Sequence, residues 1–450
     1  MELPVQQFRT KGEQGFLDMF EQAADALPGA RDPFVSGLRR NAIEAYGRLG
    51  LPHRRVEVWK YTDLRSRLTD AYPLISATGT AVGETELSRA IGSDFAALPT
   101  YRLVLAQGDL RADLSDLSGL KAAGVEVISL ARALEKPSAW LKETLGQVNP
   151  REDDPVLALN TALMTCGVAL RIGADVTLDK PIHLIQFDGK GEAASAVTRN
   201  VVIAEPGSSA MVLESYGSFG IGGLQRNAVT EVIINDKAAL HHVKLQREGG
   251  DALHLTTWLL KIGADARYDA FQFSLGAALA RNQIYAQFTG EGSQANISGA
   301  FLLRDRQHCD TTILVEHLVP RCGTRELLKA VLDQEARGVF QGKIIVAPGA
   351  QKTDSKQMAQ GLLLSEGAEF DSKPELEIFA DDVVCGHGST SGQIDEDLLF
   401  YLEARGIPEP EARALLIQAF VGEALERIED EGLREAFTKA TADWLGVSSG

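Results

Sequence analysis

Between about residues 157 and 394, the chain is a series of short runs of Val, Ile, Leu, Phe and Thr with little helical period. Turn signals separate the runs: Gly173-Ala174-Asp175, Pro206-Gly207-Ser208, Asn235-Asp236-Lys237, Gly263-Ala264-Asp265, Gly290-Glu291-Gly292 and Pro348-Gly349. From Gly173 to Gly349, 176 residues divide into six intervals that average about 29, if one missing turn near Gly323 is counted. Loosely periodic β-rich units of this length indicate a solenoid or a propeller, in which each unit buries its apolar face against the next.

The irregular length of these units favours one β architecture over the others. A parallel β-helix tolerates it because insertions extend into the corners of the helix. A propeller would show a repeated blade signature, and an antiparallel sandwich would exhaust its two-sheet core over roughly 240 residues. We therefore predict a mainly β fold with a right-handed parallel β-helix core at residues 151–394.

Helical patterns precede the predicted core. Apolar residues recur at helical spacing in two segments: Phe16, Met19, Phe20, Ala23 and Leu27, and then Val35, Leu38, Ala42, Ala45 and Leu49. Tyr101–Gln107 and Val125–Leu130 have the composition of strands. Residues 1–150 are accordingly predicted to form an N-terminal helical or α+β domain.

Helical patterns also follow the core, in residues 395–450. A first helix is predicted at roughly Glu396–Arg405, before the break at Gly406-Ile407-Pro408. A second contains Ala412, Leu415, Leu416, Ala419, Phe420, Ala424 and Ile428, and a third contains Leu433, Phe437 and Trp444. We expect these helices to form a compact domain that caps the open end of the β-core and offers a docking surface.

Charge and composition exclude several classes of partner. The net charge of −17 opposes unspecific binding to nucleic acid or to an anionic membrane. No apolar run approaches the roughly 18–20 residues that cross a bilayer, and the N-terminal sequence has neither a signal-peptide nor a transit-peptide pattern, so a cytoplasmic protein is expected. The four cysteines form no CxxC pair. They are expected to be thiols, without a closed structural zinc site.

Several catalytic motifs are absent from the sequence. It contains no G-x-x-x-x-G-K-[ST], so the chain is not expected to bind or hydrolyse a nucleotide. Gly217, Gly220, Gly222 and Gly223 do not open a helix after a strand and are interpreted as a turn. H-E-x-x-H and G-x-S-x-G are also missing. No enzymatic activity of the chain itself is predicted.

Most of the histidines and cysteines are better explained by packing than by metal binding. His241 and His242 are adjacent in a strand-like segment, as are His308 and Cys309, and adjacent strand residues point to opposite faces. His317 and Cys322 flank a turn at Pro320 and could lie close together. Packing remains the favoured role for both.

Cys385 and His387 form a more promising pair. The segment Leu376–Gly388 is predicted to be a strand that leads into a glycine-flanked end. A period of two places both side chains on one face, about 7 Å apart, where a thiolate and an imidazole can both reach iron. Gly386 and Gly388 are expected to let a ligand or a second chain approach the pair closely.

This pair supplies only half of a metal site. Two ligands fall short of the four that an iron–sulfur cluster usually has, so the pair fits a site that another subunit completes or one that binds transiently. The alternative is that Cys385 is a small buried hydrophobe and that His387 is a hydrogen-bonded turn residue. The residue types alone leave both interpretations open.

An ordered series of motifs resembles the SufB/SufD family of the sulfur-mobilisation system, and is closer to its SufD branch. The motifs are His317-x4-Cys322-x-Thr324-Arg325, Ala336–Ile344 (ARGVFQGKI), Ala350–Asp354 (AQKTD), Lys373–Ile378 (KPELEI), Asp381-Asp382-Val383, Cys385–Gly388 (CGHG) and Phe400-Tyr401-Leu402-x-x-Arg405-Gly406-Ile407. Weaker matches lie upstream at Leu159–Ala162 (LNTA) and Trp59–Thr62 (WKYT). Gly386 stands where the SufD branch commonly has serine.

The resemblance implies a scaffold subunit for iron–sulfur cluster assembly, with a β-helix core between two helical domains. It implies a SufB-like partner that binds through the β-helix and a SufC-like ATPase that binds through the C-terminal helices. A transient cluster or iron would be held at the subunit interface, where the position of His387 is essential and that of Cys385 less so. The resemblance also links the complex to reduced flavin, although the chain has no flavin motif. A surface that meets a homologous subunit can meet its own copy, so a homodimer is a further expectation for the isolated chain.

Two other functions compete with this one. A polysaccharide-active β-helix enzyme would need acid and base side chains along one groove, stacking aromatics and often secretion. Only 6% of the residues are aromatic. A non-catalytic cytosolic scaffold that binds an unrelated partner through its C-terminal helices is the third interpretation.

Overall fold

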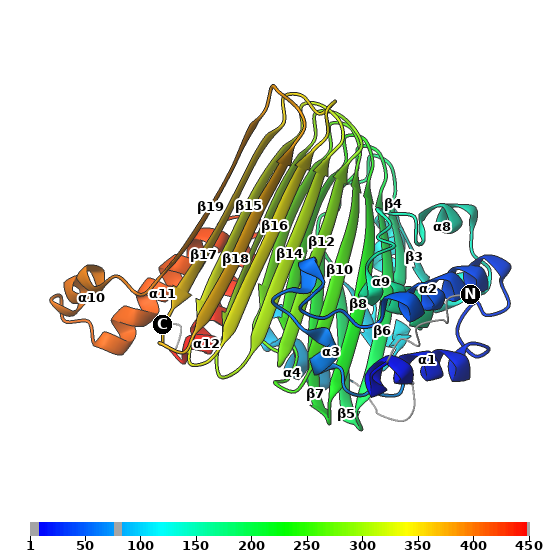
Figure 1. Ribbon diagram of the computed structural model, residues 1–450, viewed down its shortest axis with the longest axis horizontal. Coiled ribbons are helices and arrows are strands. Elements are labelled where there is room, and N and C mark those ends of the chain that lie inside the picture. Colours follow the sequence, from blue (N-terminus) through cyan, green and yellow to red (C-terminus); the bar gives the residue numbers. More distant parts are fainter. Residues whose placement is uncertain (1–8, 76–82, 448–450) are drawn as a thin grey trace, which may run out of the picture.

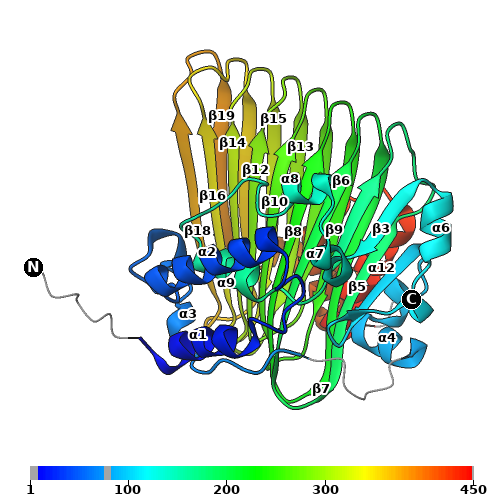
Figure 2. The same ribbon diagram turned by 90° about the vertical axis from the view of Figure 1, so that its right-hand side faces the viewer.

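The computed structural model describes residues 9–75 and 83–447 of the chain. The N-terminal residues 1–8, part of the segment in which no signal peptide is predicted, lie outside this description. Two sheets, one of ten strands and one of nine, face each other along a single axis. Figures 1 and 2 show that the strands of both sheets run side by side in a tilted stack. The predicted parallel β-helix core is confirmed, with about seven turns.

From β4 onward, even-numbered strands form one sheet and odd-numbered strands the other; β1 and β2 extend the odd sheet, and β3 extends the even sheet. The odd sheet consists of β2 (Asp109–Leu110), β1 (Tyr101–Ala106), β5 (Ile182–Gly191), β7 (Ser209–Ile221), β9 (Ala239–Arg247), β11 (Arg267–Ser274), β13 (Gln294–Leu303), β15 (Gly323–Leu332), β17 (Asp354–Leu363) and β19 (Val384–Gly392). The even sheet consists of β3 (Val125–Ser129), β4 (Val168–Ile172), β6 (Ala194–Ala204), β8 (Leu224–Ile234), β10 (Leu253–Ile262), β12 (Leu279–Phe288), β14 (His308–His317), β16 (Arg337–Val346) and β18 (Glu369–Ile378).

Successive turns of the β-helix are in parallel register. Ile297, Glu326, Gln357 and His387 follow one another on adjacent odd strands, 29, 31 and 30 residues apart in the sequence. This spacing agrees with the predicted interval of about 29 residues. The apolar core lies between the two sheets, because alternate side chains of every strand point inward and stack on those of the next turn.

The turns that lead from even to odd strands carry the periodic signal of the sequence. All of these turns except the last, between β18 and β19, contain one residue with left-handed φ: Asp175, Gly207, Lys237, Asp265, Gly292, Arg321 and Lys352. The backbone N–H of this residue bonds to a carbonyl of the next turn, as from Gly207 to Asp236 and from Lys237 to Ala264. Arg321 occupies the turn near Gly323 that had no sequence signal of its own.

The N-terminal elements cover the even sheet and close one end of the β-helix. They are α1 (Lys11–Ala23), α2 (Pro33–Leu49), η1 (Glu57–Trp59), α3 (Leu64–Arg67), α4 (Glu84–Ile91), α5 (Ser93–Ala96), η2 (Ala112–Leu114), α6 (Leu117–Ala122), α7 (Leu130–Glu135), α8 (Ala139–Thr144) and α9 (Pro155–Leu163). α1, α2, α7, α8 and α9 pack on the outer face of the even sheet, whereas α4 and α5 pack on the odd sheet. The predicted strands near residues 101 and 125 are present as β1 and β3, which extend the two sheets.

A segment around Trp59 fastens the N-terminal region across the even sheet. The Trp59 ring is buried beneath the Arg281 guanidinium, which lies 4.2 Å from the ring centroid. Arg281 is paired with buried Asp310, and Thr62 donates a hydrogen bond to the same carboxylate. The Trp59–Thr62 motif therefore has a structural role.

Three C-terminal helices agree with the predicted ones: α10 (Glu396–Glu403), α11 (Glu409–Leu425) and α12 (Glu431–Leu445). Their predicted position at the end of the β-core was wrong. α11 and α12 pack along the outer face of the odd sheet, where Phe437 meets Phe271 and Phe273, and α10 projects away from the sheets (Figure 1). Amphipathic spacing identifies the buried face of a helix but not the surface that covers it.

Among the described residues, none of the helices is both long enough and apolar enough to cross a membrane.

Candidate functional site

Cys385 and His387 lie on the last strand of the odd sheet. The sequence predicted a single strand over Leu376–Gly388, and this prediction was wrong. β18 ends at Ile378, a turn follows, and β19 begins at Val384. β19 pairs with β17 on one side and is the terminal strand of its sheet. The even sheet ends at β18, so both sheets end at the turn of the β-helix that carries the pair.

The two side chains share the inner face of β19. Cys385 is in register with Ser355, and His387 is in register with Gln357. Both β17 residues are buried between the sheets. Because no further turn covers β19, Cys385 is half-buried and His387 is exposed. The pair therefore faces the open end of the β-helix.

The environment of Cys385 favours the thiol. The residue packs against an apolar cluster that includes Ile344, Val346 and Ala380. Burial raises the pKa of the Cys385 thiol above its ordinary value, partly opposed by a hydrogen bond with the backbone of Ser355. Binding of a metal by this sulfur would therefore release a proton.

A line of hydroxyl groups and an imidazole lies behind Cys385. Thr324 and Ser355 precede Cys385 on the same line of inward-facing residues. His317 Nε2 lies 3.0 Å from the Thr324 hydroxyl and 3.4 Å from the Ser355 hydroxyl. Burial lowers the pKa of His317 to about 4, so this imidazole is neutral at physiological pH.

An amide and a carboxyl lie behind His387. Glu326 and Gln357 precede it on adjacent odd strands, and Gln357 Nε2 donates a hydrogen bond to Glu326 Oε2 at 2.7 Å. Glu326 is 4% exposed. Burial raises the pKa of its carboxyl to about 8, although the hydrogen bond from Gln357 lowers it in part. Sequence spacing missed both residues, because only the register of the turns brings them into line with His387.

Gly386 and Gly388 lie on the opposite face of β19 from the pair. Gly388 is in register with Met358, and a Cβ on Gly388 would lie 2.7 Å from Met358 Cε. A groove of about 440 Å³ lies here on the outer surface, with Lys356 and Arg427 among its lining residues. Cys385 and His387 also line this groove, so the expectation that the glycines let a ligand or a second chain approach the pair stays a prediction.

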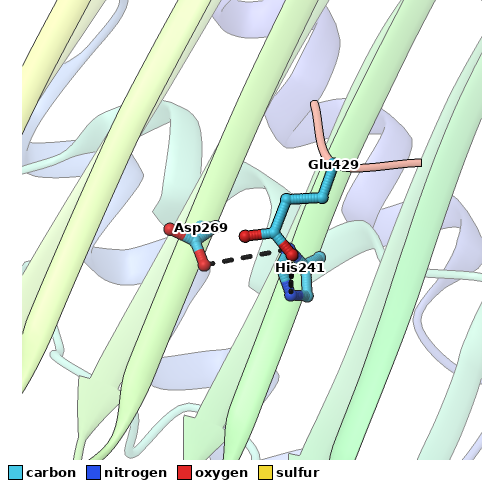
Figure 3. A group of neighbouring side chains, drawn as sticks. All are labelled: His241, Asp269 and Glu429. Carbon is cyan, nitrogen blue, oxygen red and sulfur yellow. Dashed lines mark ion pairs between the residues drawn. The ribbon is translucent and has the colours of Figure 1, made fainter. Parts of the chain in front are cut away.

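One group of side chains within the described residues has the composition of a metal site. His241, Asp269 and Glu429 come from β9, β11 and the α11–α12 connection, and their ligand atoms lie within 4.8 Å of one another (Figure 3). Arg267, however, bonds to both carboxylates, at 2.5 Å to Asp269 and 2.6 Å to Glu429. Asn296 donates to the remaining oxygen of Asp269 at 2.6 Å.

These contacts give the group a different role. The two nitrogens of His241 face different carboxylates, at 3.8 Å and 3.7 Å, so they do not converge on one point. With a guanidinium already bound, the group is an ionic clasp that holds the α11–α12 connection on the odd sheet. No sequence motif predicted this group, because its members come from three separate elements.

The other histidines singled out from the sequence are internal. His242 is buried, stacks on Trp258 and contacts Glu214 at 3.0 Å, whereas His241 points outward. His308 is held beneath the N-terminal segment by Thr62, at 2.9 Å. Cys309 points into the core, and burial raises the pKa of its thiol to about 12. Cys322 is also buried, with Sγ 3.4 Å from the Gly290 carbonyl.

The fold and the site define a class: a two-sheet β-helix protein with helical flanks and a thiol–imidazole pair at its open end. The model described as "SUF system FeS cluster assembly, SufBD core domain" matches residues 187–420, and that described as "SufBD protein N-terminal region" matches residues 10–184. The chain belongs to the SufBD family.

Relatives in three bacteria agree with this assignment. The chain is 32% identical over 416 residues to an iron–sulfur cluster assembly SufBD family protein of Synechocystis, with 89% of each chain covered. It is 31% identical over 391 residues to the iron–sulfur cluster assembly protein SufD of Escherichia coli, covering 86% of this chain and 88% of the relative. SufD of Bacillus subtilis is 25% identical over 411 residues, covering 89% and 92%.

Proposed function

We propose that the chain is a SufD-type scaffold subunit that holds iron, or a nascent iron–sulfur cluster, as cargo at the open end of its β-helix. The observation that carries this proposal is the position of His387 and Cys385. Both lie on the inner face of the terminal strand, where a second subunit can add further ligands. The family assignment and the relatives named SufD support the assembly role.

His387 is the leading ligand in this proposal. Its imidazole is exposed at the open end, whereas the Cys385 thiol is half-buried and must lose a proton to bind. An imidazole and a thiolate are both suitable ligands for iron, but two ligands leave a cluster incomplete. We therefore assign the remaining ligands and the sulfur to a SufB-like partner.

The surface around β19 supports such a partner. A terminal strand presents unpaired backbone N–H and C=O groups, which a strand of another chain can pair with. Large apolar side chains are exposed here, Phe379 in the adjoining turn at 62% and Val384 at the start of β19 at 61%. An apolar patch beside an open sheet edge is typical of a subunit interface.

We assign a second docking surface, for a SufC-like ATPase, to the C-terminal helices. α10 projects from the body and exposes Leu398, Phe400 and Tyr401, with Phe400 at 71%. Movement of a partner bound there would reach the sheet through α11, because Lys329 on β15 is paired with Glu423 on α11. ATP-driven movement could thus be transmitted to the region that carries the pair.

The substitution His387→Ala tests this proposal in cells that depend on this chain and its partners for cluster assembly. The activity of a cluster-dependent enzyme is expected to fall to background, while the amount of the chain and its co-purification with partners stay unchanged. His53→Ala is the matched control, since it removes an imidazole from the N-terminal segment, which belongs to neither proposed docking surface. Full cluster-dependent activity in the His387→Ala cells would refute the assignment.

A further inference from the structure

Three side chains from three adjacent strands form a line that ends at the open face. Register places Glu326 of β15 beside Gln357 of β17, and Gln357 beside His387 of β19, all on the inner face. Neighbouring strands are about 4.8 Å apart, so the Gln357 amide lies between a buried carboxyl and the exposed imidazole. The hydrogen bond from Gln357 Nε2 to Glu326 Oε2 already joins two members of the line.

The carbonyl oxygen of the Gln357 amide has no partner. Among the described residues, Gln357 Oε1 and Glu326 Oε1 are buried and accept no hydrogen bond. Unpaired buried oxygens destabilise a fold, so their presence calls for an explanation. Both side chains are at least nine-tenths buried, at 2% and 4% exposed.

The opposing sheet confines the Gln357 amide. A Cβ on Gly342 of β16 would lie only 1.8 Å from Gln357 Nε2. The space that Gly342 leaves free is therefore filled by this side chain. An amide held between a glycine and a carboxyl has little freedom to reorient.

We infer that Gln357 and Glu326 are positioning residues for His387. Gln357 Oε1 accepts a hydrogen bond from one imidazole N–H of His387, and Glu326 fixes the amide so that Oε1, rather than Nε2, is turned toward β19. The protonated imidazole nitrogen is thereby held inward. The other nitrogen keeps its lone pair and faces the open end, as a histidine ligand requires.

The imidazole geometry can be measured directly on the full chain labelled with ¹⁵N-histidine. Long-range ¹H–¹⁵N spectra at pH 8, where an ordinary imidazole is neutral, distinguish the two tautomers, and His387→Ala assigns the signal. One dominant His387 tautomer is expected in the wild type. In Gln357→Leu the two nitrogen shifts should move toward the average of both tautomers. An unchanged pair of shifts in Gln357→Leu would overturn the inference.

Two further variants separate positioning from a general effect on the fold. Gln360→Leu makes the same change on the outer face of β17 and should leave the His387 shifts at their wild-type values. Gln357→Glu retains an acceptor of similar shape and should restore the single tautomer. If Gln357→Leu does not fold, Glu326→Leu takes its place. This variant frees the Gln357 amide to reorient, so the His387 nitrogen shifts should again move toward the average of both tautomers. Unaltered His387 shifts in Glu326→Leu would then count against the inference.

The consequence for iron binding rests on the proposed function. The tautomer of His387 can be measured whether or not that function is correct. The iron recovered with the purified complex should fall about 10-fold or more in Gln357→Leu, the usual effect of losing a hydrogen-bond partner of a ligand. If His387→Ala keeps full activity, the proposed function fails while the tautomer result stands. If the tautomer is unmoved although His387→Ala is inactive, only the positioning inference fails.

Discussion

The Glu326 carboxyl is an ionisable group in the interior of the β-helix. Burial raises its pKa to about 8, so the group is largely neutral at physiological pH. The unfolded chain releases the same proton with a pKa near the ordinary glutamate value. The contribution of this group to the free energy of unfolding is therefore most favourable below about pH 4.5, where the carboxyl is protonated in both states. It is lost as the pH rises toward 8.

Glu326→Gln should remove this pH dependence. We expect the free energy of unfolding of the variant, relative to wild type, to be higher at pH 8 than at pH 5, by on the order of a few kcal/mol. Urea denaturation at the two pH values measures the difference. Exposed Glu366→Gln is the control and should follow the wild type at both. If the free energies of unfolding of Glu326→Gln and wild type differ by the same amount at pH 5 and at pH 8, the pKa of the carboxyl is not raised in the folded chain.

For individual residues, the sequence predicted only which neighbours along one strand share a face. A period of two was enough to place Cys385 and His387 on one face. Glu326 and Gln357 could not be recognised, because they join His387 only through a register that spans intervals of 31 and 30 residues. The predicted repeat was an average and did not fix which residues are adjacent.

The C-terminal helices are held on the odd sheet by aromatic and ionic contacts. Phe437 of α12 contacts Phe95, Phe271 and Phe273, with ring centroids 4.9, 5.4 and 5.0 Å away. Lys329, buried on β15, pairs with Glu423 of α11 and lies 4.3 Å from the Phe420 ring centroid. These contacts explain why the helices lie along the sheet and leave the end of the β-helix open.

Phe437→Ala should loosen this attachment. Loss of a buried phenylalanine costs about 3–5 kcal/mol, and faster amide hydrogen exchange is expected in α11 and α12 while the early turns, such as β7, stay protected. Hydrogen-exchange mass spectrometry measures both regions. The same truncation at exposed Phe400 should leave the exchange of α11 and α12 unchanged. Wild-type exchange in the Phe437→Ala variant would mean that other contacts hold the helices.

Helix boundaries were predictable from the sequence, but the position of the helices was not. The first C-terminal helix begins at Glu396 as predicted and ends at Glu403, two residues before the predicted end. Apolar spacing and the Gly406–Pro408 break specify such limits locally. The surface that receives the helices is assembled from strands far away in the sequence, so no local pattern identifies it.

The whole molecule is asymmetric along its axis. β1, β3 and α6 close the end near the N-terminus, whereas β18 and β19 leave the other end uncovered. The repeat that produces this shape was visible in the sequence because most of its turns carry clusters of Gly, Pro, Asn and Asp. The asymmetry was not visible, since it depends on which elements cover each end.

An uncovered end that carries His387 is the central feature of this account. It predicts that His387 contributes to holding iron only in the assembled complex, and that losing its side chain does not prevent assembly. The folding of each turn depends on its own core and on the preceding turn, so a substitution on the last strand should leave the rest of the chain intact.

The most direct measurement is the iron and acid-labile sulfide content of the complex after co-expression of the chain with its neighbouring genes. Wild type is expected to co-purify with SufB-like and SufC-like subunits and to carry iron and sulfide. His387→Ala should retain both partners and lose most of the iron and sulfide. A His387→Ala complex with wild-type iron and sulfide would contradict the account.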